Sequence, residues 1–187
     1  MTKRQFEPQR AVAPVPAALI SCGGLQGEKN IITLAWVGMV NSEPPMLSIS
    51  VRPSRYSHGL IKDTGEFVVN IPGVEQAEVV DACGLISGRK IDKFKEYNLT
   101  PVKGSLIHAP LIEECPVSID CKLNSSLSLK SHDLFVGEIV AVWAGEELIS
   151  KGKIDYAKTT VLGFSNGQYL QAQGLNLFQG FSARNKG

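Results

Sequence analysis

Residues 48–58, Ser-Ile-Ser-Val-Arg-Pro-Ser-Arg-Tyr-Ser-His, join one regular element to the next. Before Pro53 the apolar side chains alternate with serines, which is the two-residue period of a strand. Ser54 then stands ahead of apolar residues at helical spacing, and serine is a residue type that caps helices. The stretch therefore predicts a strand that leads directly into a short helix.

The same junction carries groups that bind phosphate. Arg52 and Arg55 offer guanidinium charge, and Ser54 and Ser57 offer hydroxyls. The start of a helix adds backbone N–H groups that have no partner within the helix. Together these donors would hold a phosphomonoester without a glycine-rich phosphate loop. A helix start that is merely solvated is the alternative interpretation.

Outward from this junction the sequence predicts mostly short strands. We expect strands at residues 17–22, 30–40, 46–51, 66–71, 115–123, 133–142, 160–163 and 167–170, with helices at 55–63 and 74–85. Turn residues at 124–125 and 145–146 should end two of the strands. Short strands without regular strand and helix alternation favour an antiparallel closed or partly closed barrel over a doubly wound sheet.

The chain divides into an arm, one domain and a tail. Its 187 residues suit a single domain. We expect an extended, proline-containing arm at residues 1–14, a folded domain at 15–173 and a tail at 174–187. The tail carries apolar side chains that predict either disorder or docking on a neighbouring subunit: Leu175, Leu177, Phe178 and Phe181.

The composition argues against several classes of protein. With 19 Lys and Arg against 18 Asp and Glu, the formal net charge is +1, so the chain lacks the basic surface of a nucleic-acid-binding protein. The four cysteines form no Cys-x-x-Cys pair and predict free buried thiols rather than a metal site. The first residues show neither a signal peptide nor a membrane entry, so we expect a cytoplasmic protein without a membrane partner.

Two features bear on a cofactor. The Gly-x-Gly-x-x-Gly signature of Rossmann dinucleotide binding is absent, which disfavours that mode of NAD binding. Asn30 and Thr33 stand in an otherwise apolar strand that reaches Trp36. Their amide and hydroxyl groups could face the polar edge of a planar ring, although asparagine at a strand start is also ordinary turn chemistry.

Five segments together resemble one known family. They are residues 30–36 (Asn-Ile-Ile-Thr-Leu-Ala-Trp), 43–57 (with Glu-Pro-Pro-Met-Leu and Ser-Val-Arg-Pro-Ser-Arg-Tyr-Ser), 65–72 (Gly-Glu-Phe-Val-Val-Asn-Ile-Pro), 87–94 (Ser-Gly-Arg-Lys-Ile-Asp-Lys-Phe) and 131–138 (Ser-His-Asp-Leu-Phe-Val-Gly-Glu). In this order, across residues 15–170, they resemble the flavin reductase-like and flavoredoxin family of FMN-binding split barrels. The resemblance implies a mainly β, six-stranded antiparallel split barrel with a few short helices. It also implies a homodimer that binds FMN near the subunit interface.

The resemblance further implies which residues bind the flavin. At the ring or the ribityl chain we expect Asn30, Thr33 and Trp36. At the phosphate we expect Arg52, Arg55, Ser57 and Lys93, the last from either subunit. The predicted site also includes the neighbouring positions Ile31, Leu34, Ala35 and Ser50.

His132 is the predicted catalytic residue, because the resemblance places it on the reacting side of the flavin ring. An equal alternative is a histidine at a strand start that bonds Asp133 or a backbone carbonyl. The other two histidines, His58 and His108, are expected to be structural or solvated.

The implied function is that of an oxidoreductase in which the flavin carries the hydride chemistry. The first hypothesis is an NAD(P)H-dependent flavin reductase that passes electrons from NADH or NADPH through FMN to flavin, iron or a protein acceptor. The second is a flavoredoxin-like electron carrier that takes its electrons from a redox protein and oxidises NAD(P)H poorly. A relative of pyridoxamine-phosphate oxidase is the third.

Overall fold

A computed structural model describes residues 1–172, 174, 179 and 182, so the four apolar tail positions lie outside the described residues. The main sheet has the strand order β3-β2-β6-β9-β10-β5-β4, and every neighbouring pair is antiparallel. The bounds are Ala18–Gly23 (β2), Lys29–Leu34 (β3), Val37–Ser42 (β4), Pro45–Val51 (β5), Glu66–Ile71 (β6), Val117–Ser128 (β9) and Asp133–Ala144 (β10).

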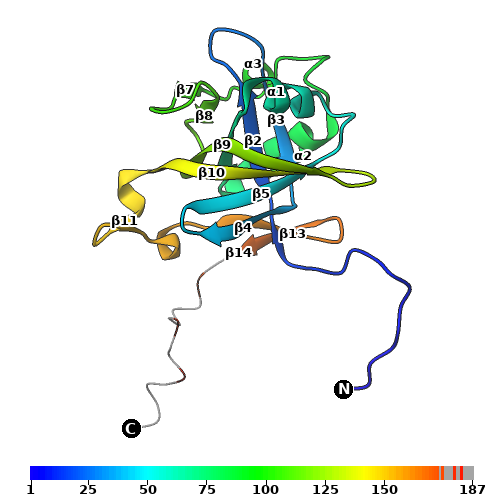
Figure 1. Ribbon diagram of the computed structural model, residues 1–187. Coiled ribbons are helices and arrows are strands. Elements are labelled where there is room, and N and C mark those ends of the chain that lie inside the picture. Colours follow the sequence, from blue (N-terminus) through cyan, green and yellow to red (C-terminus); the bar gives the residue numbers. More distant parts are fainter. Residues whose placement is uncertain (173, 175–178, 180–181, 183–187) are drawn as a thin grey trace.

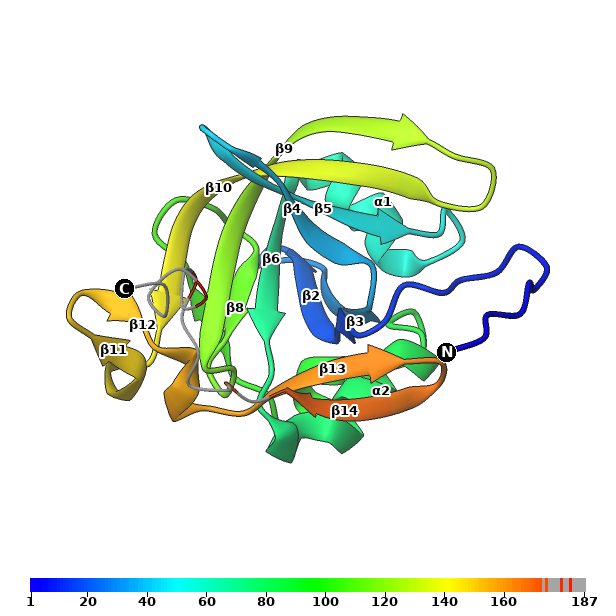
Figure 2. The same cartoon turned by 90° about the horizontal axis from the view of Figure 1, so that it is seen from below.

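This sheet curls into a split barrel around one apolar core (Figure 2). Apolar residues alternate along the strands, so one face of each strand turns inward. The core contains side chains from both halves of the sheet, among them Ile20, Ile32, Ile49, Phe67 and Phe135. Helix α1 (Tyr56–Thr64) adds Leu60 and Ile61 to this core. The predicted mainly β split-barrel class is confirmed.

The remaining elements pack outside the barrel. Helices α2 (Ala77–Leu85) and α3 (Lys93–Glu96) bury the outer face of β2 and β3, and the helices lie together at the top of Figure 1. A second sheet joins β1 (Val15–Pro16), β13 (Val161–Ser165) and β14 (Gln168–Ala172). The small elements are η1 (Val74–Gln76), β7 (Pro101–Lys103), β8 (Pro110–Ile112), η2 (Glu146–Leu148), β11 (Ile149–Ser150), β12 (Lys153–Ile154) and η3 (Tyr156–Lys158).

The main sheet has seven strands in the described chain, one more than the six implied by the resemblance. The single strand predicted at residues 30–40 is in fact two strands, because Ala35 and Trp36 are not in strand conformation. The first part, β3, pairs with β2, whereas the second part, β4, pairs with β5. β3 and β4 are the two edge strands of the main sheet, at its opposite ends. Because each part of the apolar run pairs with a different strand, the run forms two strands.

Two local predictions were also wrong. Asn124 does not end a strand: β9 continues to Ser128, and Asn124 is the extra residue of a bulge opposite β10. Ser54 does not cap α1, because Arg55 is the N-cap residue and makes no side-chain cap hydrogen bond. The short elements α3, β7 and β8 were not predicted, since three or four residues are too few to show a period.

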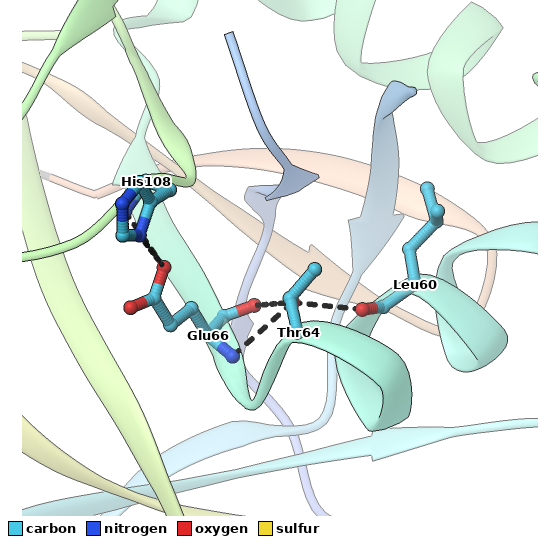
Figure 3. A network of polar contacts seen from close by, with 4 residues as sticks. All are labelled: Leu60, Thr64, Glu66 and His108. Carbon is cyan, nitrogen blue, oxygen red and sulfur yellow. Dashed lines mark hydrogen bonds and ion pairs between the residues drawn. The ribbon is translucent and has the colours of Figure 1, made fainter. Parts of the chain in front are cut away.

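The C-terminal end of α1 is fixed by a polar network (Figure 3). Gly65 adopts a left-handed conformation with φ of 67° and donates its N–H to the Ile61 carbonyl at 2.9 Å. The Thr64 hydroxyl donates to the Leu60 carbonyl at 2.8 Å, and the Glu66 carboxylate accepts the backbone N–H of His108 at 2.7 Å. With this end of α1 tied to β6 and a loop, its N-terminal end has a fixed position beside β3.

Candidate functional site

The start of β3 meets the first turn of α1 through a buried polar contact. Asn30 Nδ2 donates to the Ser57 hydroxyl at 2.8 Å, and both residues are buried. The other amide atom, Asn30 Oδ1, is buried and has no hydrogen-bond partner in the described part of the chain. A buried acceptor without a donor is unfavourable, so Asn30 is suited to a ligand that brings a hydroxyl or an N–H group.

Lys93 comes to the same place from α3. Its ammonium donates to the backbone carbonyls of Ile31 and Cys83, each at 2.6 Å, and the residue is only 3% exposed. An ammonium has three protons, so these two bonds leave one for another acceptor. Burial lowers the pKa of Lys93, and the nearby charge of Arg55 lowers it as well.

The charge of Lys93 has no anionic partner among the described residues. Two thiols act electrostatically on Lys93, but burial raises the pKa of Cys83 to about 11 and that of Cys22 to about 12, so both are neutral near pH 7. A buried cation without a counter-ion is costly unless a ligand supplies the negative charge. The unpaired charge of Lys93 therefore favours an anionic ligand beside it.

These groups line a pocket of about 140 Å³, which we call the Lys93 pocket. It lies between β3, the start of α1 and the segment that joins α2 to α3, and of its described lining residues only Arg55 and Lys93 are charged. The lining consists of Asn30, Ile32, Ser54, Arg55, Tyr56, Cys83, Gly84, Ile86, Ser87, Gly88 and Lys93. At Gly88 a Cβ atom would lie 2.0 Å from Asn30 Oδ1, so a larger residue there would displace the Asn30 side chain.

Four predicted residues follow Asn30 along the chain and do not line the Lys93 pocket. The Ile31 side chain is buried in the cluster beneath α2, and the Thr33 hydroxyl donates to the Val80 carbonyl of α2. Leu34 packs on the barrel core, and Ala35 lies at the break between β3 and β4. Of the residues predicted in this run, the structure therefore places only Asn30 in the described lining of the Lys93 pocket, next to Ile32, which was not predicted. Ile31 contributes its backbone carbonyl to Lys93.

A second group, which we call the Trp36 surface, consists of Trp36, Arg52 and His132. The rings of Trp36 and His132 lie with their centroids 4.8 Å apart, and Trp36 is 44% exposed. Partial burial lowers the pKa of His132, and the charge of Arg52 lowers it further. Ser50 belongs beside them, since its N–H donates to the Trp36 carbonyl at 3.1 Å. Arg52, predicted at the phosphate, is thus beside His132 and is not part of the described lining of the Lys93 pocket.

The hydrogen bond from His58 to Asp133 connects the two groups. His58 Nε2 lies 2.7 Å from Asp133 Oδ2, and both side chains are about one-tenth exposed. His58 follows Ser57 on α1, and Asp133 follows His132 at the start of β10. This bond lowers the pKa of Asp133. His58 thus has the structural role, one of the two expected for it. The alternative prediction that His132 bonds Asp133 is wrong, because His132 bonds the Ser131 hydroxyl at 2.9 Å.

The residues present fit a phosphorylated ligand that also carries hydroxyl groups. Lys93, Arg55 and the start of α1 suit the phosphate, and the unpaired Asn30 Oδ1 suits a hydroxyl donor. FMN has both kinds of group, on its ribityl phosphate chain. Sequence reasoning missed several aromatic, apolar or small residues of the described lining, which carry no signal of their own: Ile32, Tyr56, Cys83, Gly84 and Ile86.

Comparisons with known proteins show the family and the fold of the chain. The model of a family described as flavin reductase like domain matches residues 10–173. A flavoredoxin of Desulfovibrio vulgaris (Miyazaki F) has a TM-score of 0.90 and 30% identity, with 98% of this chain and all of that one covered. A flavoredoxin of Methanosarcina acetivorans has a TM-score of 0.85 and 31% identity over 98% and 100%. The protein YddH of Escherichia coli (strain K12) is 34% identical over 74% of this chain and 75% of its own.

Among residues 1–172, 174, 179 and 182, no helix is both long enough and apolar enough to cross a membrane.

Proposed function

The chain belongs to the family of flavin reductase like domains, and we propose that it binds FMN with the phosphate in the Lys93 pocket and passes electrons from NADH or NADPH to a flavin, iron or protein acceptor. The bound flavin supplies the redox chemistry by accepting a hydride and releasing electrons. The chain itself binds the phosphate through Lys93, Arg55 and the start of α1. Reduced nicotinamides are coenzymes of the cytoplasm, which is the basis for a cytoplasmic location.

The observation that carries the proposal is the buried ammonium of Lys93. It is held by two carbonyls in a pocket whose described lining has no acidic side chain. A purely structural lysine would gain nothing from a second cation, Arg55, at the same pocket. An anion there offsets both charges, and a terminal phosphate dianion offsets them better than the diester of FAD.

A flavoredoxin-like electron carrier is the second candidate. Two of the solved structures most similar to this chain are described as flavoredoxins, at 30% and 31% identity. Such a carrier would use the same flavin pocket but receive its electrons from a protein partner. The two candidates therefore differ in the electron donor and not in the Lys93 pocket.

We also propose a homodimer. The described residues of the main sheet expose large apolar side chains, with Met39 63% exposed on β4 and Leu127 57% exposed on β9, two strands away from β5. Val40 on β4 and Leu129, just after β9, are also more than half exposed. Covering large apolar side chains contributes about 1.5 to 3 kcal/mol each before ordering costs. A monomer mass by light scattering with FMN bound would contradict the homodimer.

Anaerobic reduction tests the proposed function. The purified protein is loaded with FMN, its visible spectrum is recorded, and NADH or NADPH is added without oxygen. We expect the absorbance of oxidised flavin to be lost rapidly once about one equivalent of NADH or NADPH per bound FMN has been added. A flavin that stays oxidised with both nicotinamides, but is reduced by a reduced ferredoxin, would replace the reductase by the carrier. A protein that binds no FMN would overturn both.

A further inference from the structure

A second pocket, of about 430 Å³, lies at the opposite end of β3 from the Lys93 pocket. We call it the arm pocket, because residues of the N-terminal arm form one wall. Its described lining consists of Gln9, Arg10, Val12, Val15, Ala35, Trp36, Phe164, Ser165, Asn166 and Gly167. This volume falls within the range of about 300 to 1,000 Å³ that small-molecule sites occupy.

The far walls of the arm pocket are fixed by pairing. Val15 and Pro16 of β1 pair with Phe164 and Gly163 of β13, which ties the arm to the second sheet five residues after Arg10. The turn between β13 and β14 places Asn166 at φ of 47° and Gly167 at 87°, the two positive values of a tight hairpin turn. The walls from β1 and the β13–β14 turn are therefore held by backbone hydrogen bonds.

The chemistry of the lining is aromatic and positively charged. Of the described residues that line the arm pocket, Arg10 alone carries a charge. Trp36 and Phe164 present two aromatic rings, and Trp36 leaves 44% of its surface exposed. A flat ring would cover this exposed indole, and Arg10 would pair with an anionic group on the same ligand.

The position of the arm pocket connects it to the redox site. Trp36 belongs to the lining and also contacts the ring of His132 on the Trp36 surface. Asn30, at the start of β3, lines the Lys93 pocket, and Ala35, just beyond its end, lines the arm pocket. Five residues of strand separate them by about 17 Å. A ligand in the arm pocket would thus lie next to the Trp36 surface, and it would not compete for the residues of the Lys93 pocket that bind the FMN phosphate.

We propose that the arm pocket binds a redox partner of the flavin that has a flat ring and an anionic group, and that Arg10 holds the anion. Two sources share this chemistry: a nicotinamide dinucleotide, through one of its phosphates, and an aromatic carboxylate that accepts electrons. The role as a partner of the flavin rests on the proposed function. Binding to Arg10 can be measured independently of it.

Calorimetric titration of the FMN-loaded protein tests this site. The variants are Arg10→Gln and, as a matched control, Arg4→Gln, which removes the same charge from the same arm outside the lining. The probes are NADP⁺ and benzoate, neither of which requires a turnover. We expect Arg10→Gln to weaken at least one probe about ten- to hundred-fold, the effect of one lost charge-assisted bond, while Arg4→Gln binds like the wild type.

The outcomes separate the two sources and the two proposals. If Arg10→Gln weakens only NADP⁺ binding, the arm pocket is assigned to the electron donor, a nicotinamide dinucleotide. If it weakens only benzoate binding, the pocket is assigned to an aromatic electron acceptor. Equal binding by Arg10→Gln and wild type for both probes, or no binding of either probe to the wild type, would overturn the arm pocket. FMN content and anaerobic reduction by NADPH are recorded on the same samples, so a failure of the flavin proposal is seen separately.

Discussion

The Lys93 pocket and the Trp36 surface differ in how firmly their polar groups are held. In the Lys93 pocket, Asn30 and Lys93 are buried and bonded to three groups from distant parts of the chain, the Ser57 hydroxyl and the Ile31 and Cys83 carbonyls. On the Trp36 surface, Trp36 and Arg52 are exposed, and His132 bonds only its neighbour Ser131 among the described residues. A pocket whose polar groups are already held in place suits tight binding of a cofactor, whereas an exposed surface suits partners that bind transiently.

The largest effect is expected at Lys93. Lys93→Met leaves the Ile31 and Cys83 carbonyls without their donor, which costs about 1 to 3 kcal/mol for each buried group, and removes the cation that would meet the phosphate. We expect lower stability in urea and a loss of FMN binding. Lys95→Met, on the exposed side of the same short helix, is the control and should change neither. A folded Lys93→Met protein with wild-type FMN affinity would contradict the role of the pocket.

A smaller effect is expected at Gly88. In Gly88→Ala the new methyl group would lie 2.0 Å from Asn30 Oδ1, so Asn30 must move and weaken its bond to Ser57. We expect about a ten-fold loss of FMN affinity, since one hydrogen bond contributes about 1 kcal/mol or somewhat more. Gly59→Ala in α1 meets open space and should be neutral or slightly stabilising. Equal FMN affinities for the two variants would show that Asn30 does not shape the pocket.

The smallest effect on stability is expected at His132. Since this ring is partly exposed and bonds an exposed serine, His132→Ala should leave folding and FMN content close to wild type. If the ring contacts the reacting groups, the rate of anaerobic flavin reduction should fall by about ten-fold, which corresponds to about 1.4 kcal/mol in the barrier. Lys130→Ala in the same turn is the control. A destabilised His132→Ala protein that still reduces at the wild-type rate would remove the catalytic role.

The sequence predicted the fold better than the orientation of the site residues. The alternating apolar pattern and the family resemblance predicted the split barrel, because both depend on segments that can be read locally. Asn30 and Thr33 were placed together on the flavin, but residues three apart in a strand point to opposite faces. Thr33 accordingly bonds α2, whereas Asn30 faces the pocket.

Contacts between distant segments explain the rest. Lys93 was predicted as a phosphate contact from the resemblance, but its bonds to Ile31 and Cys83 depend on how α3 packs on β3. The bond between Asn30 and Ser57 joins residues 27 apart in the chain, and no local period indicates it. The separation of Arg52 from the Lys93 pocket likewise follows from the turn between β5 and α1, where Arg55 N–H donates to the Arg52 carbonyl at 3.0 Å.

The most direct test of the Lys93 pocket as a phosphate site compares FMN with riboflavin, which has the same ring and ribityl chain but no phosphate. Binding of both ligands is measured for the wild type and for Arg55→Gln, a change at the exposed edge of the pocket. We expect the variant to bind FMN about ten- to hundred-fold more weakly and riboflavin as well as the wild type does. Equal losses for FMN and riboflavin, or equal affinity of the wild type for the two ligands, would contradict the account.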